Sequence, residues 1–140
     1  MNPEVHLNKT YQADASTLYS AWTNPEFIQK WLCPFPGGCR LVANVLEVGG
    51  DYMILMREDG KPYPHYGEYR TLEPNKCIAF TWNSPFATDT LLTIELTEDG
   101  DQTHLSLRHT GFKNQEDCDQ HQEGWTACLE NLGPAVLVRR

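Results

Sequence analysis

Two histidines near the C-terminal end are the side chains best suited to chemistry. His109 closes the run THLSLRH, in which Leu105 and Leu107 alternate with polar residues, so these three share one face of a predicted strand. His121 precedes Trp125 by four residues in a predicted helix, which places both on one side of that helix. Histidine titrates near neutral pH, so such a pair is able to act as acid or base, or to orient a carboxylate or carbonyl group. Two hydrogen-bonded structural histidines are the alternative interpretation.

No further catalytic residue is predicted, because the sequence has no recognisable serine, histidine and aspartate arrangement. The five cysteines cannot all pair within the chain, and without a secretory leader we expect them to be reduced, as in a cytoplasmic protein. Cys33 and Cys39 flank CPFPGG, and their pairing stays open. Zinc sites use two close ligand pairs, and the spacing of Cys118 and His121 supplies only one. We therefore predict neither a metal nor a cofactor.

A larger set of aromatic, aliphatic and methionine side chains shares the inward faces of the predicted strands and helix. This set is either plain core or the wall of an apolar cavity, in which a few polar groups orient a ligand. The candidate ligand-binding residues are Tyr52, Ile54, Met56, Tyr69, Phe80, Trp82, Leu107, His109, His121, Trp125 and Leu129.

Several other residues are assigned to structure. Trp22 and Trp31 are predicted to plug one end of the sheet, and Glu68 and Glu73 to lie on the solvated surface. Gly67 stands inside a predicted strand, where glycine usually marks a bulge or a close approach.

The elements that must position these residues follow from periodicity and turn chemistry. A strand over 4–12 precedes two short helices, 15–22 capped by Asp14 and 25–32 capped by Asn24. Six strands joined by tight turns are predicted over 40–48, 51–58, 65–72, 77–82, 91–96 and 103–109. A long helix begins after Asn114 and is expected to end or kink at Gly133-Pro134. This order predicts an α+β fold, with a curved antiparallel sheet wrapped around the last helix.

Composition narrows the class of protein. A chain of 140 residues, 40% hydrophobic and 21% charged, predicts a single globular domain over 1–140. No apolar run approaches the roughly 20 residues of a membrane span. A formal net charge of −8 argues against binding to nucleic acid or to an anionic membrane surface.

Four passages carry a resemblance to a known family. They are SAWTNPEFIQKWLCP, GGDYMILMREDGKPYPHYGEYRTLEPNKCIAFTW, LSLRHTGF and HQEGWTACLENL. Together they resemble the START-like, or SRPBCC, superfamily with its helix-grip fold, and within it the activator of heat-shock protein 90 ATPase homologue-like family. One departure is Leu32, where the family often has a second tryptophan. Another is GPAVLVRR at the end, which is expected to shorten the helix.

The resemblance implies a function as well as a fold. It implies binding of a small apolar or amphipathic molecule in a cavity between the sheet and the C-terminal helix, by a monomer or weak dimer. One alternative is an enzyme acting on such a molecule, of the cyclase, dehydratase or hydrolase type. A second alternative is a chaperone cofactor of the heat-shock protein 90 activator type.

Overall fold

A seven-stranded antiparallel sheet curves around one long helix. The computed structural model describes residues 3–32, 39–58, 61–85 and 87–136. The elements in chain order are β1 (Val5–Tyr11), α1 (Ala15–Thr23), α2 (Pro25–Trp31), β2 (Cys39–Asn44), β3 (Asp51–Glu58), β4 (Lys61–Glu73), β5 (Cys77–Trp82), β6 (Thr90–Asp99), β7 (Gln102–Thr110) and α3 (Gln115–Val136). The predicted helix-grip fold is confirmed.

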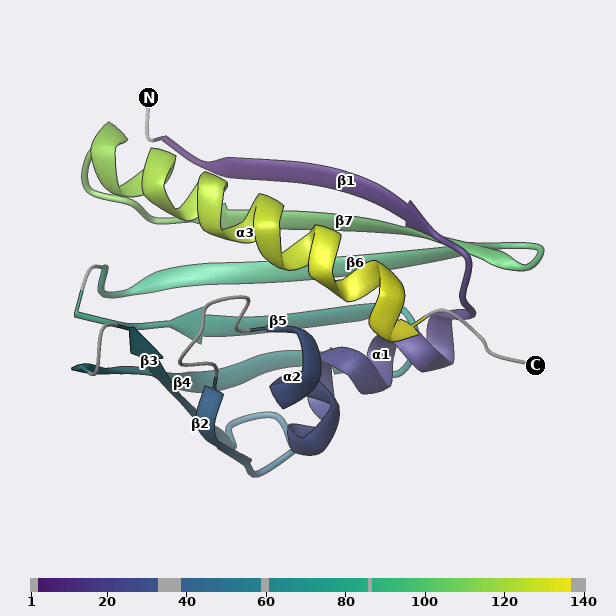
Figure 1. Ribbon diagram of the computed structural model, residues 1–140, viewed down its shortest axis with the longest axis horizontal. Coiled ribbons are helices and arrows are strands. Elements are labelled where there is room, and N and C mark those ends of the chain that lie inside the picture. The colour runs from purple at the N-terminus through teal and green to yellow at the C-terminus, as the bar shows by residue number, and fades with distance from the viewer. Residues whose placement is uncertain (1–2, 33–38, 59–60, 86, 137–140) are drawn as a thin grey trace.

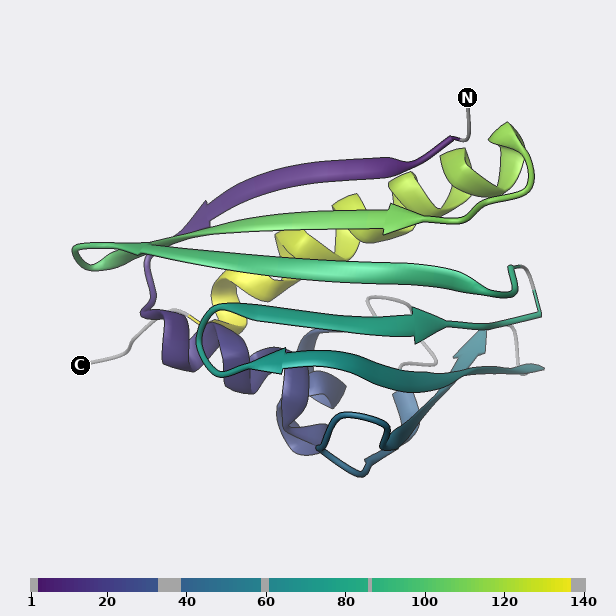
Figure 2. The ribbon, with the colours of Figure 1, turned by 180° about the vertical axis from the view of Figure 1, so that it is seen from behind.

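Most strands of the sheet lie beside their neighbours in the chain, and the helices lie on one face. The sheet runs β1-β7-β6-β5-β4-β3-β2, so consecutive hairpins from β2 to β7 place neighbours in the chain side by side. Helix α3 crosses one face, while α1 and α2 close the sheet near the C-terminal end of α3 (Figure 1). Among the described residues, no helix lies over the opposite face when the molecule is seen from behind (Figure 2).

The helix starts follow from side chains that satisfy free backbone N–H groups. Asp14 Oδ1 accepts from the backbone N–H of Thr17 at 2.8 Å, and Asn24 Oδ1 accepts from that of Glu26 at 3.0 Å. Asn114 Oδ1 accepts from the N–H of Asp117 at 2.8 Å and starts α3 in the same way. The predicted helix starts are therefore confirmed.

The strand predicted over 40–48 ends earlier than expected, at Asn44. The chain then turns tightly, because Val45 N–H donates to Asp51 O and Gly50 N–H donates to Glu47 O, both at 2.8 Å. The apolar residues of this turn face solvent, with Val48 66% exposed. The apolar residues after Asn44 therefore do not continue the strand, although their hydrophobicity predicts it.

Helix α3 continues through Gly133-Pro134 to Val136, so the prediction of a shortened helix is wrong. A proline removes one intrahelical hydrogen bond, and this one stands only two residues from the helix end. The final turn is held by burial, because Leu132 is fully buried and Val136 is nearly so. The apolar contacts of that turn outweigh the lost bond.

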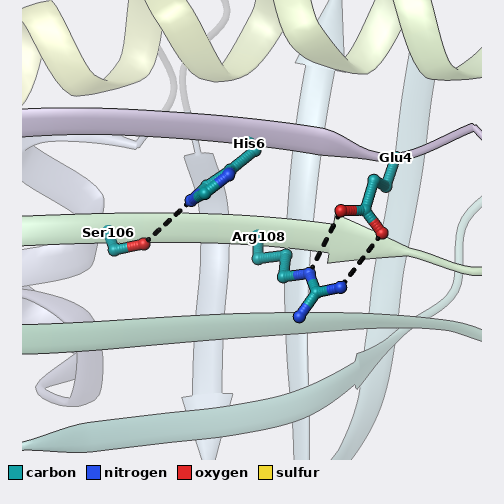
Figure 3. Close-up of polar contacts among 4 residues, drawn as sticks. All are labelled: Glu4, His6, Ser106 and Arg108. Carbon is teal, nitrogen blue, oxygen red and sulfur yellow. Dashed lines mark hydrogen bonds and ion pairs between the residues drawn. The ribbon is translucent and has the colours of Figure 1, made fainter.

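The two faces of the sheet differ in chemistry. The face toward α3 carries the core, while the outer face near β1 and β7 carries polar pairs across the strands (Figure 3). Arg108 donates to both carboxylate oxygens of Glu4 at 3.3 Å, and His6 Nε2 contacts Ser106 Oγ at 3.4 Å. No helix within the described ranges is long and apolar enough to cross a membrane.

Candidate ligand pocket between the sheet and the last helix

The middle of the space between sheet and helix is filled by aromatic side chains. Tyr52 packs edge to face on Phe80 with ring centres 5.2 Å apart, and Tyr69 lies 5.7 Å from Tyr52. The Tyr52 hydroxyl donates to the carbonyl oxygen of Thr81 at 2.5 Å, although these residues lie on β3 and β5. The cavity left here is only about 20 Å³, room for about one water molecule.

Gly67 allows the Tyr52 hydroxyl on β3 to reach the Thr81 carbonyl oxygen on β5 across the intervening strand β4. It pairs with Tyr52 in register, on the strand between β3 and β5. A Cβ at this position would overlap the carbonyl oxygen of Thr81 and lie 2.6 Å from its hydroxyl oxygen. The close approach predicted for Gly67 is therefore confirmed.

The tryptophans of α1 and α2 close one end of the core, as predicted. Trp22 and Trp31 are 4% and 0% exposed and pack edge to face at 4.6 Å. Trp31 Nε1 donates to Ala21 O at 2.8 Å, which ties the second helix to the first. Trp125 of α3 packs on Trp22 at 5.8 Å, so the last helix joins the same cluster.

A larger pocket, of about 160 Å³, opens farther toward the start of α3. Its wall combines apolar side chains with three polar ones, and comprises Leu32, Met56, His65, Trp82, Gln120, His121, Gly124, Trp125 and Cys128. Five of these come from α3 at the spacing of one helical face. Gln120 and Gly124 are exposed, so the mouth of the pocket lies along that helix.

His109 is held in a chain of hydrogen bonds that uses both of its ring nitrogens. Trp125 Nε1–H donates to His109 Nδ1 at 3.1 Å, and an indole nitrogen can only donate. His109 Nε2 therefore carries the proton of the neutral ring and donates to Thr90 Oγ1 at 2.8 Å. Thr90 in turn donates to Trp82 O at 2.5 Å. Burial, with the nearby imidazole of His121, lowers the pKa of His109 to about 3.

His121 is arranged differently. Its ring stands edge to face with that of His109, with centres 5.2 Å apart, so the two imidazoles do meet as the sequence predicted. His121 is half-buried and lines the pocket, whereas His109 does not. Its Nδ1–H donates to Asp117 O at 2.7 Å, because a carbonyl oxygen can only accept. In the neutral ring this leaves the lone pair on Nε2.

A third histidine of the pocket, His65, was missed by the sequence interpretation. It lies on β4, is 7% exposed, and its ring is tilted by 51° against that of Trp82, with ring centres 5.0 Å apart. Its Nδ1–H donates to Tyr63 O at 2.9 Å. Burial lowers the pKa of His65 to about 4, so its ring is neutral at pH 7. The signal was present, since His65, Gly67 and Tyr69 follow the two-residue period of one strand face.

The pocket thiol does not have the properties of a nucleophile. Cys128 is buried, its Sγ–H donates to Leu32 O at 3.0 Å, and burial raises its pKa to about 12. In the parts of the chain that the structure describes, no three His, Cys, Asp or Glu side chains gather where they could hold a metal. Cys33 lies outside the described residues, as does the side chain of Cys39, so their pairing stays a question of sequence alone.

The comparisons with known proteins bear on this geometry. Residues 12–136 match the profile of the family described as activator of Hsp90 ATPase homolog 1-like protein. The chain belongs to this family. The resemblance to the START-like superfamily is thereby confirmed. No curated protein matches the chain in sequence.

Solved structures share the fold of this family member. Protein CV1439 from Chromobacterium violaceum is 24% identical, with a TM-score of 0.90 over 98% of this chain and 99% of that one. The Aha1 dimer from Colwellia psychrerythraea is 17% identical, with a TM-score of 0.77 over 96% of both chains. CalU16 from Micromonospora echinospora is 22% identical, with a TM-score of 0.75 over 95% of this chain and 75% of that one. At these identities the likeness shows the fold.

Within this family member, the residues predicted to bind a ligand separate into three groups. Met56, Trp82, His121 and Trp125 line the larger pocket, and the two tryptophans also line the small cavity. Of these two spaces, Tyr52, Ile54, Tyr69 and Phe80 line only the small cavity. Leu107, His109 and Leu129 are buried and belong to neither lining. The lining residues absent from the sequence prediction are Leu32, His65, Gln120, Gly124 and Cys128.

Proposed function

We propose that this family member binds a small, mainly apolar molecule in the pocket of about 160 Å³ beside α3. The expected binding site thereby shifts from the centre of the fold, where aromatic rings fill the space, to the pocket beside residues 120–128 of α3. A cavity of about 150 Å³ with apolar walls is large enough for benzene, so the pocket suits one ring or a short chain.

Gly124 is the observation that carries this proposal. Glycine inside a helix costs about 1 kcal/mol relative to alanine. Packing does not demand glycine here, because a Cβ at this position would meet nothing within 4 Å. Gly124 is also exposed and forms part of the pocket wall. The missing side chain therefore keeps open a space that any larger residue would narrow.

The remaining wall supports an apolar ligand with one polar end. The indole rings of Trp82 and Trp125, with centres 5.1 Å apart, provide flat apolar surface next to Met56. His65 and His121 add two imidazoles to this surface. A few polar groups among apolar walls are the usual composition of a small-molecule site.

Filling the pocket mouth tests the proposal. Toluene binding is measured by calorimetry for the native protein, for Gly124→Leu, and for Ala127→Leu as the matched control. Ala127 is exposed on the same helix and does not line the pocket. We expect Gly124→Leu to weaken binding by about tenfold or more, since the new side chain occupies ligand space, and Ala127→Leu to leave it unchanged. Equal affinity in all three proteins, or no binding to any, would contradict the proposal.

A further inference from the structure

The outer face of the sheet carries an apolar groove across β2, β3 and β4. Alternate residues of a strand point to opposite faces, so Met53 points away from α3, because its neighbours Tyr52 and Ile54 belong to the core. Met53 is 42% exposed and pairs in register with Ala43 on β2 and with Tyr66 on β4. These three side chains form an apolar row that lines a groove of about 510 Å³. No helix of the described residues covers this face (Figure 2).

Exposed apolar residues are concentrated around this groove. Among the described residues, the exposed large hydrophobic side chains are Val45, Leu46, Val48, Met53, Tyr66 and Leu91. Five of these six lie in the turn 45–50, on β3 or on β4, and only Leu91 lies elsewhere, on β6. Scattered exposed apolar residues are ordinary, whereas a group of them around one groove is typical of a binding surface.

Two carboxylates lie beside the apolar row. Asp51 lines the groove and pairs in register with Glu68, so the two side chains lie opposite each other on the face that carries Met53 and Tyr66. Like charges in this arrangement repel each other. Arg70 Nε lies 3.8 Å from one oxygen of Glu68, whereas Asp51 makes no ion pair with any described residue. The described lining has no lysine or arginine, so the groove combines an apolar floor with negative charge.

This charge distinguishes between the possible occupants of the groove. An anionic membrane surface would be repelled by the two carboxylates and by the formal net charge of −8. A second copy that docked through the same groove would bring Asp51 and Glu68 against an equally acidic surface. A basic partner would be attracted instead. A lysine side chain suits both parts of the groove, because its aliphatic stem can cover apolar surface while its ammonium group contacts carboxylates.

We propose that this groove docks a segment of another protein in which lysine or arginine stands between apolar residues. The apolar side chains of the segment pack on Met53 and Tyr66. A basic side chain extends along the strands to Asp51 and Glu68, two residues or about 7 Å away, which is within the length of an extended lysine. The groove lies on the opposite face of the sheet from the pocket beside α3, so this proposal is independent of ligand binding there.

Short labelled peptides test the proposal by fluorescence anisotropy at low ionic strength. The probe is leucine-lysine-leucine-lysine-leucine with blocked ends, and the comparison peptide has glutamate in place of both lysines. We expect the lysine peptide to bind about tenfold or more tightly than the glutamate peptide, and its affinity to fall as salt is added. Equal binding of the two peptides, or no binding of the lysine peptide at millimolar concentration, would overturn the proposal.

Substitutions at exposed positions test whether the peptide binds in the groove. Asp51→Asn should weaken binding of the lysine peptide by about threefold, and Met53→Ser by about fivefold, because they remove the charge and the apolar contact. Glu95→Gln is the matched control, since it removes an exposed carboxylate from β6 that does not line the groove. It should leave the affinity unchanged.

Three results would contradict this assignment. If Glu95→Gln weakens binding as much as Asp51→Asn, the peptide responds only to net charge and the proposal is overturned. Unchanged affinity in both groove variants would place the peptide elsewhere and overturn it as well. If the native protein instead associates with itself, or binds phosphatidylcholine vesicles, and Met53→Ser abolishes that interaction, the occupant is a second copy or a membrane and not a basic segment.

Discussion

Two glycines in this molecule have opposite consequences. At Gly67, on β4, a Cβ would overlap Thr81 O, so the missing side chain lets two strands and the Tyr52 ring pack together. At Gly124, on α3, a Cβ would meet nothing within 4 Å, so the missing side chain leaves space. Tyr52, which pairs with the first glycine, lines a cavity of only about 20 Å³, and the second glycine lines the pocket of about 160 Å³.

The contrast shows how one fold provides both a filled centre and an open pocket. Strands β3 and β5 and helix α3 contribute residues to both regions, through Ile54 and Met56, Phe80 and Trp82, and Trp125. Architecture alone therefore does not decide where the space lies. The sizes of individual side chains decide where the space lies. The effect of each glycine on stability and on the open space can be tested by substitution.

Gly67→Ala is expected to have the largest effect. The added methyl group must displace the Thr81 backbone and disturb the hydrogen bond that the Tyr52 hydroxyl makes to it. We expect a loss of about 3 kcal/mol in the free energy of unfolding, and a fall of roughly 10 °C in melting temperature. Denaturant unfolding measures this loss. A change below about 0.5 kcal/mol would contradict the close approach.

The buried imidazole of His109 should make the stability of the folded protein depend on pH in acid. The folded pKa of His109, about 3, is below the value near 6.5 of an unfolded chain. The unfolded state then binds the extra proton as the pH falls through 6.5 toward 3. The resulting stability is complete above about pH 6.5 and is lost below it, by about 2 kcal/mol between pH 7 and pH 5.

His109→Gln isolates this contribution, because glutamine can still accept from Trp125 and donate to Thr90 but does not titrate. The difference in unfolding free energy between pH 7 and pH 5 should be about 2 kcal/mol smaller in the variant than in the native protein. His65, whose folded pKa is about 4, has the same sign and should account for part of the dependence that remains. Parallel pH curves for the two proteins would refute the buried neutral state of His109.

Sequence reasoning located the elements well because periodicity and capping are local. Asp14, Asn24 and Asn114 each accept a hydrogen bond from a backbone N–H group within three residues. Helix starts of this kind can therefore be predicted without knowledge of the tertiary structure. The errors occurred where tertiary burial decides. Val45, Leu46 and Val48 have apolar side chains but lie outside the strands of the sheet. Val136 is buried strongly enough to extend a helix past proline.

The site was harder to predict than the fold, because a pocket depends on what is absent. Trp82 and Trp125 were identified by their size and face, but the sequence did not indicate that Leu107 and Leu129 would lie outside the pocket lining. Gly124 was part of the family resemblance, yet its significance depends on the space around it. That space is set by residues far apart in sequence, such as Leu32 and Met56.

Gly124→Ala should have a smaller effect, and one of the opposite sign to Gly67→Ala. Alanine improves helix propensity and meets no neighbour, so we expect a gain of about 0.5–1 kcal/mol in unfolding free energy. The reverse change at a nearby exposed position, Ala127→Gly, should cost a similar amount. Toluene affinity should fall modestly in the first variant and stay constant in the second. A destabilised Gly124→Ala protein would show that this glycine is required for packing.

The outer face of the sheet supplies the smallest expected effect and a baseline for the others. Arg108 on β7 forms a two-bond ion pair with Glu4, the residue before β1, but their side chains are 57% and 40% exposed (Figure 3). Water and salt screen such a pair, and ordering two long side chains opposes the attraction. Glu4→Gln should therefore lower the free energy of unfolding by no more than about 0.5 kcal/mol. The difference should vanish at about 1 M salt, where charges are screened within about 3 Å. A larger loss that persists in salt would mean that this exposed ion pair contributes as much to stability as packing in the centre. The glycine variants could then no longer be compared with a surface substitution of small effect.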